Sequence, residues 1–306
     1  MRVKYFLLSL VLVGSISSVR ACEACGCSIM FWDLGITPRF QSHQISLGWQ
    51  YQAFNSFASF ADLQKGQVGS QEQFYQLDLQ TQWRLHQRWR LNISLPYSFL
   101  ERSITADEAE WQMNGWSDPS ALLQFVAIDQ DEEASSAWRH RLSIGAGVKL
   151  PWGESNNLPE SETVQTNFRL GTGSTDAMLY LQYVLRKDRW GVSLDGLFSR
   201  NGENAEEYQY GHRASGHLNF FGVFSAGKVG IMPSAGLYHE QAQMDVQRSY
   251  FRNHTGGYYT FGQVGTQLFW PGFSAMLRYQ LPLAQNWADG LTEAEARWAI
   301  QVSYFL

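Results

Sequence analysis

Hydrophobic and polar residues alternate along most of this chain with a period of two. Within residues 297–306, Ile300 and Val302 fall on one side, whereas Gln301 and Ser303 fall on the other. Successive side chains of a β-strand point to opposite faces, so the pattern predicts strands with one apolar and one polar face. About twelve such strands are predicted, at residues 42–54, 72–86, 89–101, 118–128, 138–150, 175–186, 189–201, 208–224, 228–241, 258–270, 273–283 and 295–306.

The connectors between these strands alternate in length. Tight turns are predicted at 87–88, 187–188, 226–227 and 271–272, and one connector of the same set, 129–137, is longer and acidic. The longer connectors lie between them, at 55–71, 102–117, 151–174, 202–207, 242–257 and 284–294. Outer-membrane barrels have short periplasmic turns and longer external loops, and an even strand number brings both termini to the periplasm.

The length of the apolar faces and the aromatic content favour a membrane barrel. A tilted strand needs about 9–11 residues to cross hydrocarbon, which 138–150 and 175–186 provide. The chain has 12 Trp and 14 Tyr, as expected of aromatic girdles at both interfaces. We therefore predict an all-β protein, a transmembrane antiparallel β-barrel of about twelve strands in the outer membrane of a Gram-negative bacterium. A soluble β-sandwich or lipocalin-like barrel is the alternative.

The charges of the chain restrict its partners. The net charge is -5 and the 23 Lys and Arg are scattered, so no basic face is available for nucleic acid. The predicted inward faces carry charges of both signs, at Asp78, Arg84, Arg141, Lys149, Arg186, Asp195, Arg278 and Arg297. Such charges can pair across a twelve-strand lumen, which disfavours an open general porin and a long apolar cargo. A narrow or gated path for a small polar solute or a metal complex is predicted.

The N-terminus has the features of a secretory signal peptide over residues 1–21, with a basic start, an apolar run and cleavage before Cys22. The apolar run is too short for a membrane-spanning helix. Lipoprotein processing at Cys22 is the alternative, although Arg20 stands where a lipobox has a small residue. The remaining chain divides into a cysteine-containing segment, 22–40, and the barrel, 41–306.

All three cysteines of the chain, Cys22, Cys25 and Cys27, lie within six residues of each other. Three thiolates at this spacing can converge on one soft metal ion, which favours Cu(I) or Zn. The fourth ligand would come from elsewhere. A haem c site is excluded because Gly26, not His, follows Cys25. In an oxidising periplasm, one disulfide with a leftover thiol, or a lipid anchor, is the alternative.

Four short motifs, at 95–99 (LPYSF), 115–118 (GWSD), 147–153 (GVKLPWG) and 170–176 (LGTGSTD), follow one another along the chain. In order and spacing they resemble the outer-membrane proteins linked to meta-pathway phenol degradation. The resemblance covers about residues 40–306 and implies a transporter barrel related to the long-chain fatty-acid transporters. Trp152 departs from the family pattern, and the resemblance implies no substrate class.

The same motifs have a structural interpretation, which the residue types favour. Glycines permit unusual backbone angles at strand ends, and Asp118 and Asp176 can accept hydrogen bonds from nearby backbone amides. The terminal Cys-x-x-Cys-Gly-Cys-Ser, 22–28, followed by a barrel is similar to a transporter-like group in Bacteroidota. Residues 28–40 are apolar and precede the first strand, so they either plug the lumen or pack against the periplasmic rim.

These observations predict an outer-membrane transporter or gated channel for a small solute, linked to copper or zinc through the cysteines. Its expected partners are the lipid bilayer, the barrel assembly machinery and the solute or metal ion. A structural or adhesive barrel is the alternative. An outer-membrane hydrolase is a third class, but we predict no enzyme, because the polar grouping at 252–255 lacks an adjacent serine nucleophile.

Overall fold

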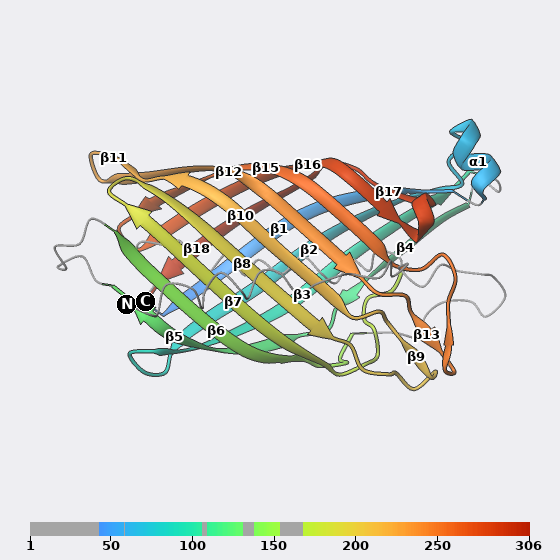
Figure 1. Cartoon of the computed structure of the whole chain (residues 1–306), viewed down its shortest axis with the longest axis horizontal. Coiled ribbons are helices and arrows are strands. Elements are labelled where there is room, and N and C mark those ends of the chain that lie inside the picture. The colour runs from blue at the N-terminus through green and yellow to red at the C-terminus, as the bar shows by residue number, and fades with distance from the viewer. Residues whose placement is uncertain (1–42, 58, 106–108, 131–137, 154–167) are drawn as a thin grey trace, which may run out of the picture.

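The computed structural model describes residues 43–57, 59–105, 109–130, 138–153 and 168–306. These residues form a closed antiparallel β-barrel of 12 strands, as the alternation predicted (Figure 1). The spanning strands are β1 (Gln44–Ser56), β2 (Ser70–Arg84), β3 (Trp89–Ile104), β5 (Ser120–Asp129) continued by β4 (Ala109–Trp116), β6 (Arg139–Lys149), β7 (Asp176–Lys187), β8 (Trp190–Arg200), β10 (Arg213–Gly222), β12 (Val229–Ala242), β15 (Gly257–Trp270), β16 (Phe273–Trp287), and β18 (Arg297–Phe305) with β17 (Thr292–Ala294).

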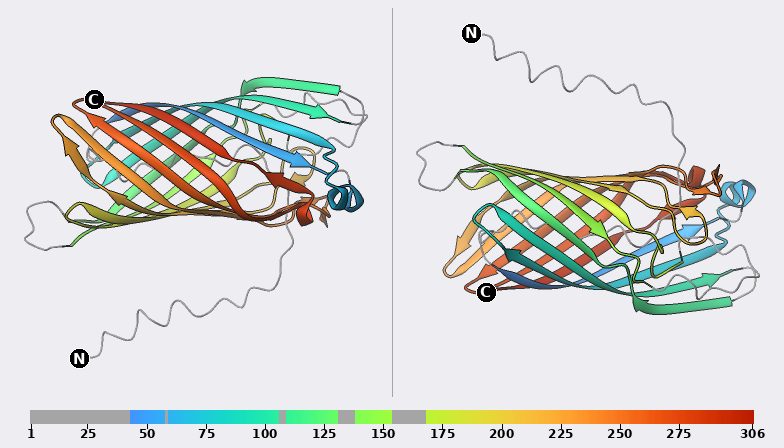
Figure 2. Two further views of the ribbon diagram at one scale, coloured as in Figure 1. Left: turned by 90° about the horizontal axis from the view of Figure 1, so that it is seen from above. Right: turned by 90° about the horizontal axis from the view of Figure 1, so that it is seen from below.

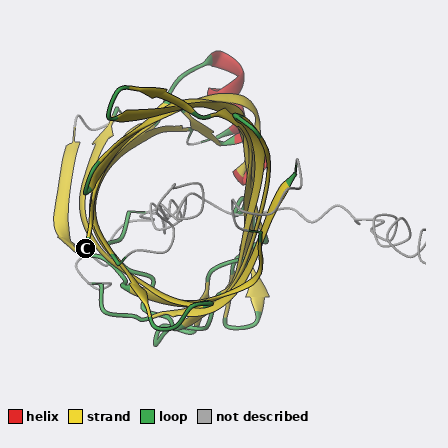
Figure 3. Ribbon diagram, turned by 90° about the vertical axis from the view of Figure 1, so that its left-hand side faces the viewer, coloured by secondary structure: helices red, strands yellow, loops and turns green. Residues whose placement is uncertain are grey.

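The barrel closes where the first strand meets the last. β1 and β18 run antiparallel, with Gln44 opposite Phe305 and Tyr51 opposite Trp298, so every spanning strand has two neighbours (Figure 3). Closure removes the unpaired edges that an open sheet would expose to lipid. No helix in the described part of the chain is long and apolar enough to span a membrane.

The outer wall carries an apolar band bordered by aromatic side chains. Ile45 and Leu47 on β1, and Ile300 and Val302 on β18, are exposed, whereas the residues between them are buried. Exposed tryptophans mark the end of the barrel with the short turns, at Trp83, Trp89, Trp138, Trp190 and Trp270. This distribution matches a lipid-facing surface with an interfacial girdle, and short turns at this end are the arrangement expected of the periplasmic side.

Several strands continue past the predicted limits at the opposite end, which we call the loop end. Residues 102–117 were predicted to be a loop, but β3 continues to Ile104 and pairs with β4. β4 and the short helix α1 (Phe60–Lys65) extend past the rim (Figure 2). The prediction was wrong because the many polar residues of this hairpin obscure the alternation of hydrophobic and polar positions. Ladder hydrogen bonds, which do not require apolar faces, maintain the strands outside the bilayer.

The boundaries of two further elements differ from the sequence prediction. Residues 284–294 were predicted to be a loop, but β16 runs to Trp287, and a 3₁₀ turn (Ala288–Gly290) leads into β17. The predicted strand 208–224 begins with β9 (Tyr208–Gln209), which belongs to a small separate sheet with β13 (Val246–Gln247) and β14 (Tyr250–Phe251). Gly211 lies between β9 and β10, and a Cβ atom there would lie 1.8 Å from the carbonyl oxygen of Gln243.

Candidate functional site

The lumen is lined with amides, hydroxyls and charged groups over the half of the barrel nearer the turn end. Asp78 accepts hydrogen bonds from Ser94 Oγ at 2.7 Å and from Gln80 Nε2 at 2.6 Å. Asp195 accepts one from Gln182 Nε2 at 2.6 Å and one from the Tyr180 hydroxyl at 3.1 Å. Because both carboxylates are bonded within the wall, they order the neighbouring amides and keep the lining polar.

Other amide groups of this lining have atoms without a protein partner. Both side-chain polar atoms of Gln50, the side-chain oxygen of Asn92 and Nε2 of Gln124 are buried and make no hydrogen bond within the described residues. Unsatisfied polar groups are costly in an apolar core but ordinary where they face a path for water and solute. These groups keep hydrogen-bonding capacity that the described residues do not use.

The predicted inward charges divide into two sets. Five of them, Asp78, Lys149, Asp195, Arg278 and Arg297, are buried on the inner face, as predicted. The other three lie toward the turn end. Arg141 pairs with Asp129 at 3.1 Å, Arg186 Nε donates to the carbonyl of Asp188, and Arg84 is exposed. The ion pairs of Arg141 and Lys149 join groups on neighbouring segments of the wall.

Lys149 holds the shortest of these ion pairs, at the loop end of β6. Its Nζ lies 3.0 Å from Asp118 Oδ2 and 2.6 Å from Asp176 Oδ2, and it also donates to the hydroxyl of Thr172. Asp118 accepts backbone N–H groups from Gly153 at 2.9 Å and from Thr172 at 2.8 Å. We call these residues, Lys149, Asp118, Asp176, Thr172 and Gly153, the Lys149 clasp. It ties both ends of the 150–175 connector to the barrel wall.

Two glycines allow the Lys149 clasp to form. A Cβ atom on Gly171 would lie 2.6 Å from Asp118 Oδ1 and 2.9 Å from the Cα atom of Gly153, which is closer than Cβ atoms approach in proteins. Three of the four motifs found in the sequence, 115–118, 147–153 and 170–176, thus meet at one point. Asp118 and Asp176 accept hydrogen bonds from backbone N–H groups, and Gly173 has a positive φ of 70°, as the structural interpretation predicted. Gly153 and Gly171 instead permit a close approach of two backbone segments, which was not predicted.

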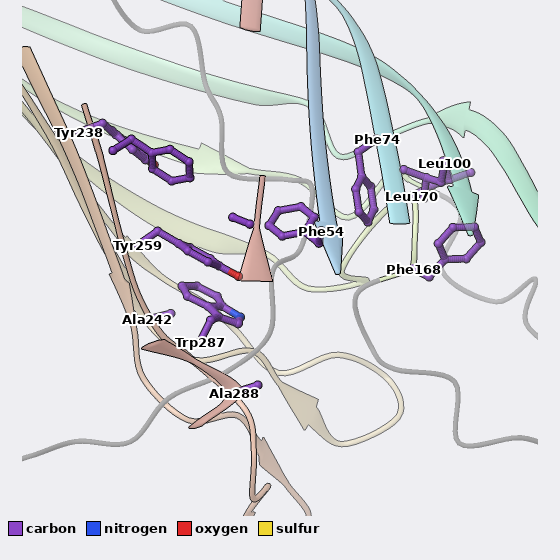
Figure 4. Packing of buried hydrophobic residues seen from close by; sticks show 12 residues of the cluster. Phe54, Phe74, Leu100, Phe168, Leu170, Tyr238, Ala242, Tyr259, Trp287 and Ala288 are labelled. Carbon is purple, nitrogen blue, oxygen red and sulfur yellow. The ribbon is translucent and has the colours of Figure 1, made fainter. Parts of the chain in front are cut away.

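Beyond the Lys149 clasp, an apolar cluster lies on the inner face near the loop end. Strand residues of this lumenal aromatic cluster are Phe54, Phe74, Leu100, Tyr238, Ala242, Tyr259, Phe261, Trp287 and Ala294; the 3₁₀ turn adds Ala288, and the connector adds Phe168 and Leu170 (Figure 4). Phe168 packs against Phe74 with ring centroids 6.5 Å apart. The connector therefore folds inward, and the Lys149 clasp fixes the segment that carries its two apolar side chains.

Charged groups adjoin the lumenal aromatic cluster. Glu72 pairs with Arg102 at 3.4 Å, and Glu240 pairs with Arg213 at 3.1 Å. Arg297 has three rings around its guanidinium carbon, with Phe261 the nearest at 4.1 Å from the ring centroid. Cations over ring faces are attracted by the ring quadrupole. This end of the lumen thus combines aromatic walls with buried charge, unlike the amide-rich half.

Sequence reasoning did not identify this cluster, although part of the signal was present. Phe54 lies an even number of residues from the inward-facing Gln50 and Gln52, and so does Phe74 from Asp78, which puts both rings on the inner face. Aromatic residues near strand ends were expected in lipid-facing girdles, so their phase was overlooked. Glu72 and Arg102 were missed because the sequence placed Arg102 in a loop.

The predicted metal ligands, Cys22, Cys25 and Cys27, lie outside the described residues, as do the signal peptide and residues 28–40. Within the described part of the chain, no cluster of three His, Cys, Asp or Glu side chains could hold a metal ion. His254 of the 252–255 grouping pairs with Asp289 at 3.0 Å, a contact that the sequence did not suggest. No Ser or Thr hydroxyl of the described residues bonds to His254, and Thr255 donates to the carbonyl of Arg252 instead.

Comparison with solved structures agrees with this architecture. The chain is similar to an outer membrane channel from Pseudomonas putida F1, with a TM-score of 0.61 and 14% identity over 87% of this chain and 96% of that one. It is also similar to the β domain of the Bordetella autotransporter BrkA, with a TM-score of 0.51 and 11% identity over 87% of this chain and 100% of that one. No protein-family model and no curated protein matches the sequence. The fold and its surface define an outer-membrane β-barrel.

Proposed function

We propose that the chain is an outer-membrane channel or transporter for a small polar or charged solute. The observation that carries this proposal is the change of lining along the lumen. An amide-rich half leads to the lumenal aromatic cluster, where the inward connector is fixed by the Lys149 clasp. Inward polar groups suit a solute with hydrogen-bonding groups, and bulky rings limit its width. A purely structural or adhesive barrel has no need of an internal loop anchored in this way.

The resemblance of the four motifs to transporter barrels supports the same class, and so does the fold shared with an outer membrane channel. The fold is shared with an autotransporter β domain as well, so the argument depends on the lining of the lumen and not on the fold.

Conductance in planar lipid bilayers tests the proposal. We expect the purified full chain to give discrete current steps, and vesicles that contain it to swell in solutions of small polar solutes. A larger solute, such as a trisaccharide, is expected to be excluded by the narrowed lumen. A correctly folded barrel that gives neither current steps nor swelling would contradict the proposal and favour a structural or adhesive role.

From the sequence alone, we also propose that Cys22, Cys25 and Cys27 bind Cu(I) or Zn and link the channel to metal handling. The test is the metal content of protein purified from outer membranes after copper or zinc supplementation. Near-stoichiometric metal that is lost in both Cys25→Ser and Cys27→Ser supports the proposal. Cysteines found oxidised or acylated, without metal, would refute it while leaving the channel proposal intact.

A further inference from the structure

We propose that a hollow in the lumen wall beside Arg278 binds the carboxylate of a small acid on its way through the barrel. This inference rests on the proposed channel function and names the class of solute that the amide-rich half of the lumen selects. It follows from three observations: a cavity with amide walls, a buried guanidinium at its side, and an excess of positive charge on the surrounding strands.

The hollow exists because small residues face the lumen on neighbouring strands. The register of β12, β15, β16 and β18 aligns one row of inward residues, Ser234, Gly265, Arg278 and Ala299. Only Arg278 in this row has a long side chain, so space remains next to it. This space forms a cavity of about 40 Å³. Since a single water needs roughly 10–15 Å³, the cavity has room for about three waters or for one carboxylate group.

The hollow is reached from the lumen. Most of the residues that line it stand at inward positions of their strands. Four of these inward residues are nevertheless partly exposed: Ser234, Gly265, Gln267 and Met276. Exposure on the inner side of a closed wall means that solvent space adjoins them. A solute inside the barrel can therefore enter the hollow without any change in strand pairing.

Side-chain amides form much of the wall of the hollow. Gln263, Gln267 and Gln301 stand in the rows on either side of the guanidinium and line the same cavity. Gln301 Nε2 donates to Gln80 Oε1 at 3.2 Å, and Gln267 Nε2 donates to Ser274 Oγ at 3.4 Å. A side-chain amide nitrogen carries two protons, so each of these groups can give a second hydrogen bond to a bound oxygen.

Arg278 supplies the positive charge of the hollow. The residue is 6% exposed, and its Nη2 lies 3.8 Å from Sδ of Met276. A guanidinium presents a planar fork of donors that matches a carboxylate in two parallel hydrogen bonds. Among the described residues that line the hollow there is no Asp or Glu. One positive charge surrounded by neutral donors suits a monoanion better than a dianion, whose second charge would stay unbalanced.

The strands around the hollow carry an excess of positive charge. β10, β12, β15, β16 and β18 are neighbours in the barrel, and their charged residues are Glu240, Arg213, Arg278 and Arg297. Three arginines against one glutamate give this sector a formal charge of +2 with His neutral. Glu240 is already held by Arg213 at 3.1 Å. A wall with one sign of charge raises the local concentration of the opposite ion, so this side of the lumen favours anions.

Binding of ¹³C-carboxyl-labelled lactate to the full chain in detergent, followed by NMR line broadening, tests the inference. We expect saturable binding to the wild type, binding at least about tenfold weaker for Arg278→Gln, and a smaller loss for Arg278→Lys, which keeps the charge and removes the fork. Neutral lactamide should bind at least about tenfold more weakly than lactate, and inorganic phosphate at least about threefold. Arg186→Gln, which removes an arginine of β7 outside this sector, is the matched control and should stay within about twofold of wild type.

A second pair of variants tests the hollow without removing the charge. Ser234→Leu fills the cavity and leaves Arg278 in place, so lactate should bind at least about tenfold more weakly. Ser234→Ala keeps the space and should stay within about twofold of wild type.

Heat-modifiable migration on denaturing gels shows which variants are folded barrels. If Arg278→Gln does not fold, the comparison of Ser234→Leu with Ser234→Ala decides. Equal lactate affinity of wild type and Arg278→Gln, phosphate binding as tight as that of lactate, or no saturable binding to the wild type would overturn the inference. If current steps are seen without lactate binding, only this inference fails. Binding without current steps would instead refute the channel proposal and leave the carboxylate site in place.

Discussion

Individual inward-facing residues give the two halves of the lumen different chemistry. Toward the turn end, inward positions hold short amides and hydroxyls, as in Gln44, Ser46 and Ser303, which bond to one another at 2.7–3.0 Å. Toward the loop end, the same parity of β1 reaches Phe54, and that of β18 reaches Arg297. Every second residue of a strand faces the lumen, so the residue types at these inward positions alone change the lining from amides to aromatic and cationic groups.

Titration of His212 offers a test at this scale. His212 lies just outside β10, and its Nδ1 accepts the backbone N–H of Asn201 at 3.3 Å. Burial lowers the pKa of His212, the positive charge of Arg200 acts in the same direction, and Asp176 opposes them. The pKa of His212 is lower in the folded state than in the unfolded state. Its contribution to the free energy of unfolding is therefore fully present above the unfolded pKa of about 6.5 and is lost as the pH falls below that value.

We therefore expect the imidazole resonances of His212, followed by NMR against pH, to titrate with a midpoint below 6.5. The backbone amide of Asn201 should shift with the same midpoint, because protonation removes its acceptor. His212→Gln serves as the assignment control. A midpoint at or above the ordinary value would show that burial does not govern this group.

At the scale of elements, the Lys149 clasp connects the end of β6, the start of β7 and the bend between β4 and β5. It fixes the segment that carries Phe168 and Leu170 into the lumen. Little chain separates the Lys149 clasp from these apolar side chains, because Thr172 bonds to Asp118 only two residues after Leu170. A change in the clasp should therefore alter the position of the connector more than the integrity of the barrel.

Replacing Lys149 by Met tests this relation. The variant leaves Asp118 and Asp176 buried without their cation, a change that costs about 3–5 kcal/mol in buried ion pairs. We expect the loss to appear as local opening of the connector, with faster tryptic cleavage after Arg169 and larger conductance steps than wild type. Lys228→Met, in an exposed turn, should match wild type in both measurements. Unchanged cleavage and conductance would show that the clasp does not position the connector.

At the scale of the whole molecule, the barrel was predictable because each strand has to satisfy lipid on one face and the lumen on the other. That requirement repeats in every spanning segment, so the alternation of residues such as Ile45 and Ser46 is enough to reveal it. The lumenal aromatic cluster could not be derived in the same way. Phe54, Phe261 and Arg297 come together only through the register of β15, β16, β18 and β1, and the local pattern of each strand does not contain it. The Lys149–Asp118 pair spans 31 residues and is equally invisible in any one segment.

The lipid-facing surface gives a prediction for the barrel as one unit. Ile300 is exposed near the middle of β18, whereas Tyr304 is exposed near the turn end. We expect Ile300→Arg to reduce the free energy of unfolding by about 2–4 kcal/mol and Tyr304→Arg by about 0–1 kcal/mol, because the cost of a charge falls toward the interface. Denaturant unfolding in lipid vesicles measures both. Equal losses at the two positions would argue against the assigned membrane band.

The seam between β1 and β18 has a consequence for how the molecule forms. Its ladder joins residues from opposite ends of the sequence, and Gln44 and Ser303, which bond at 3.0 Å, are 259 residues apart. Pairings of such long range form slowly, since a large loop entropy must be overcome before they contribute. Until β18 arrives, the growing sheet presents two unsatisfied edges that neither lipid nor neighbouring strands can cover. Production of this protein is therefore most exposed to aggregation in the interval before that final strand docks, and it is there that a periplasmic holdase should improve the yield most.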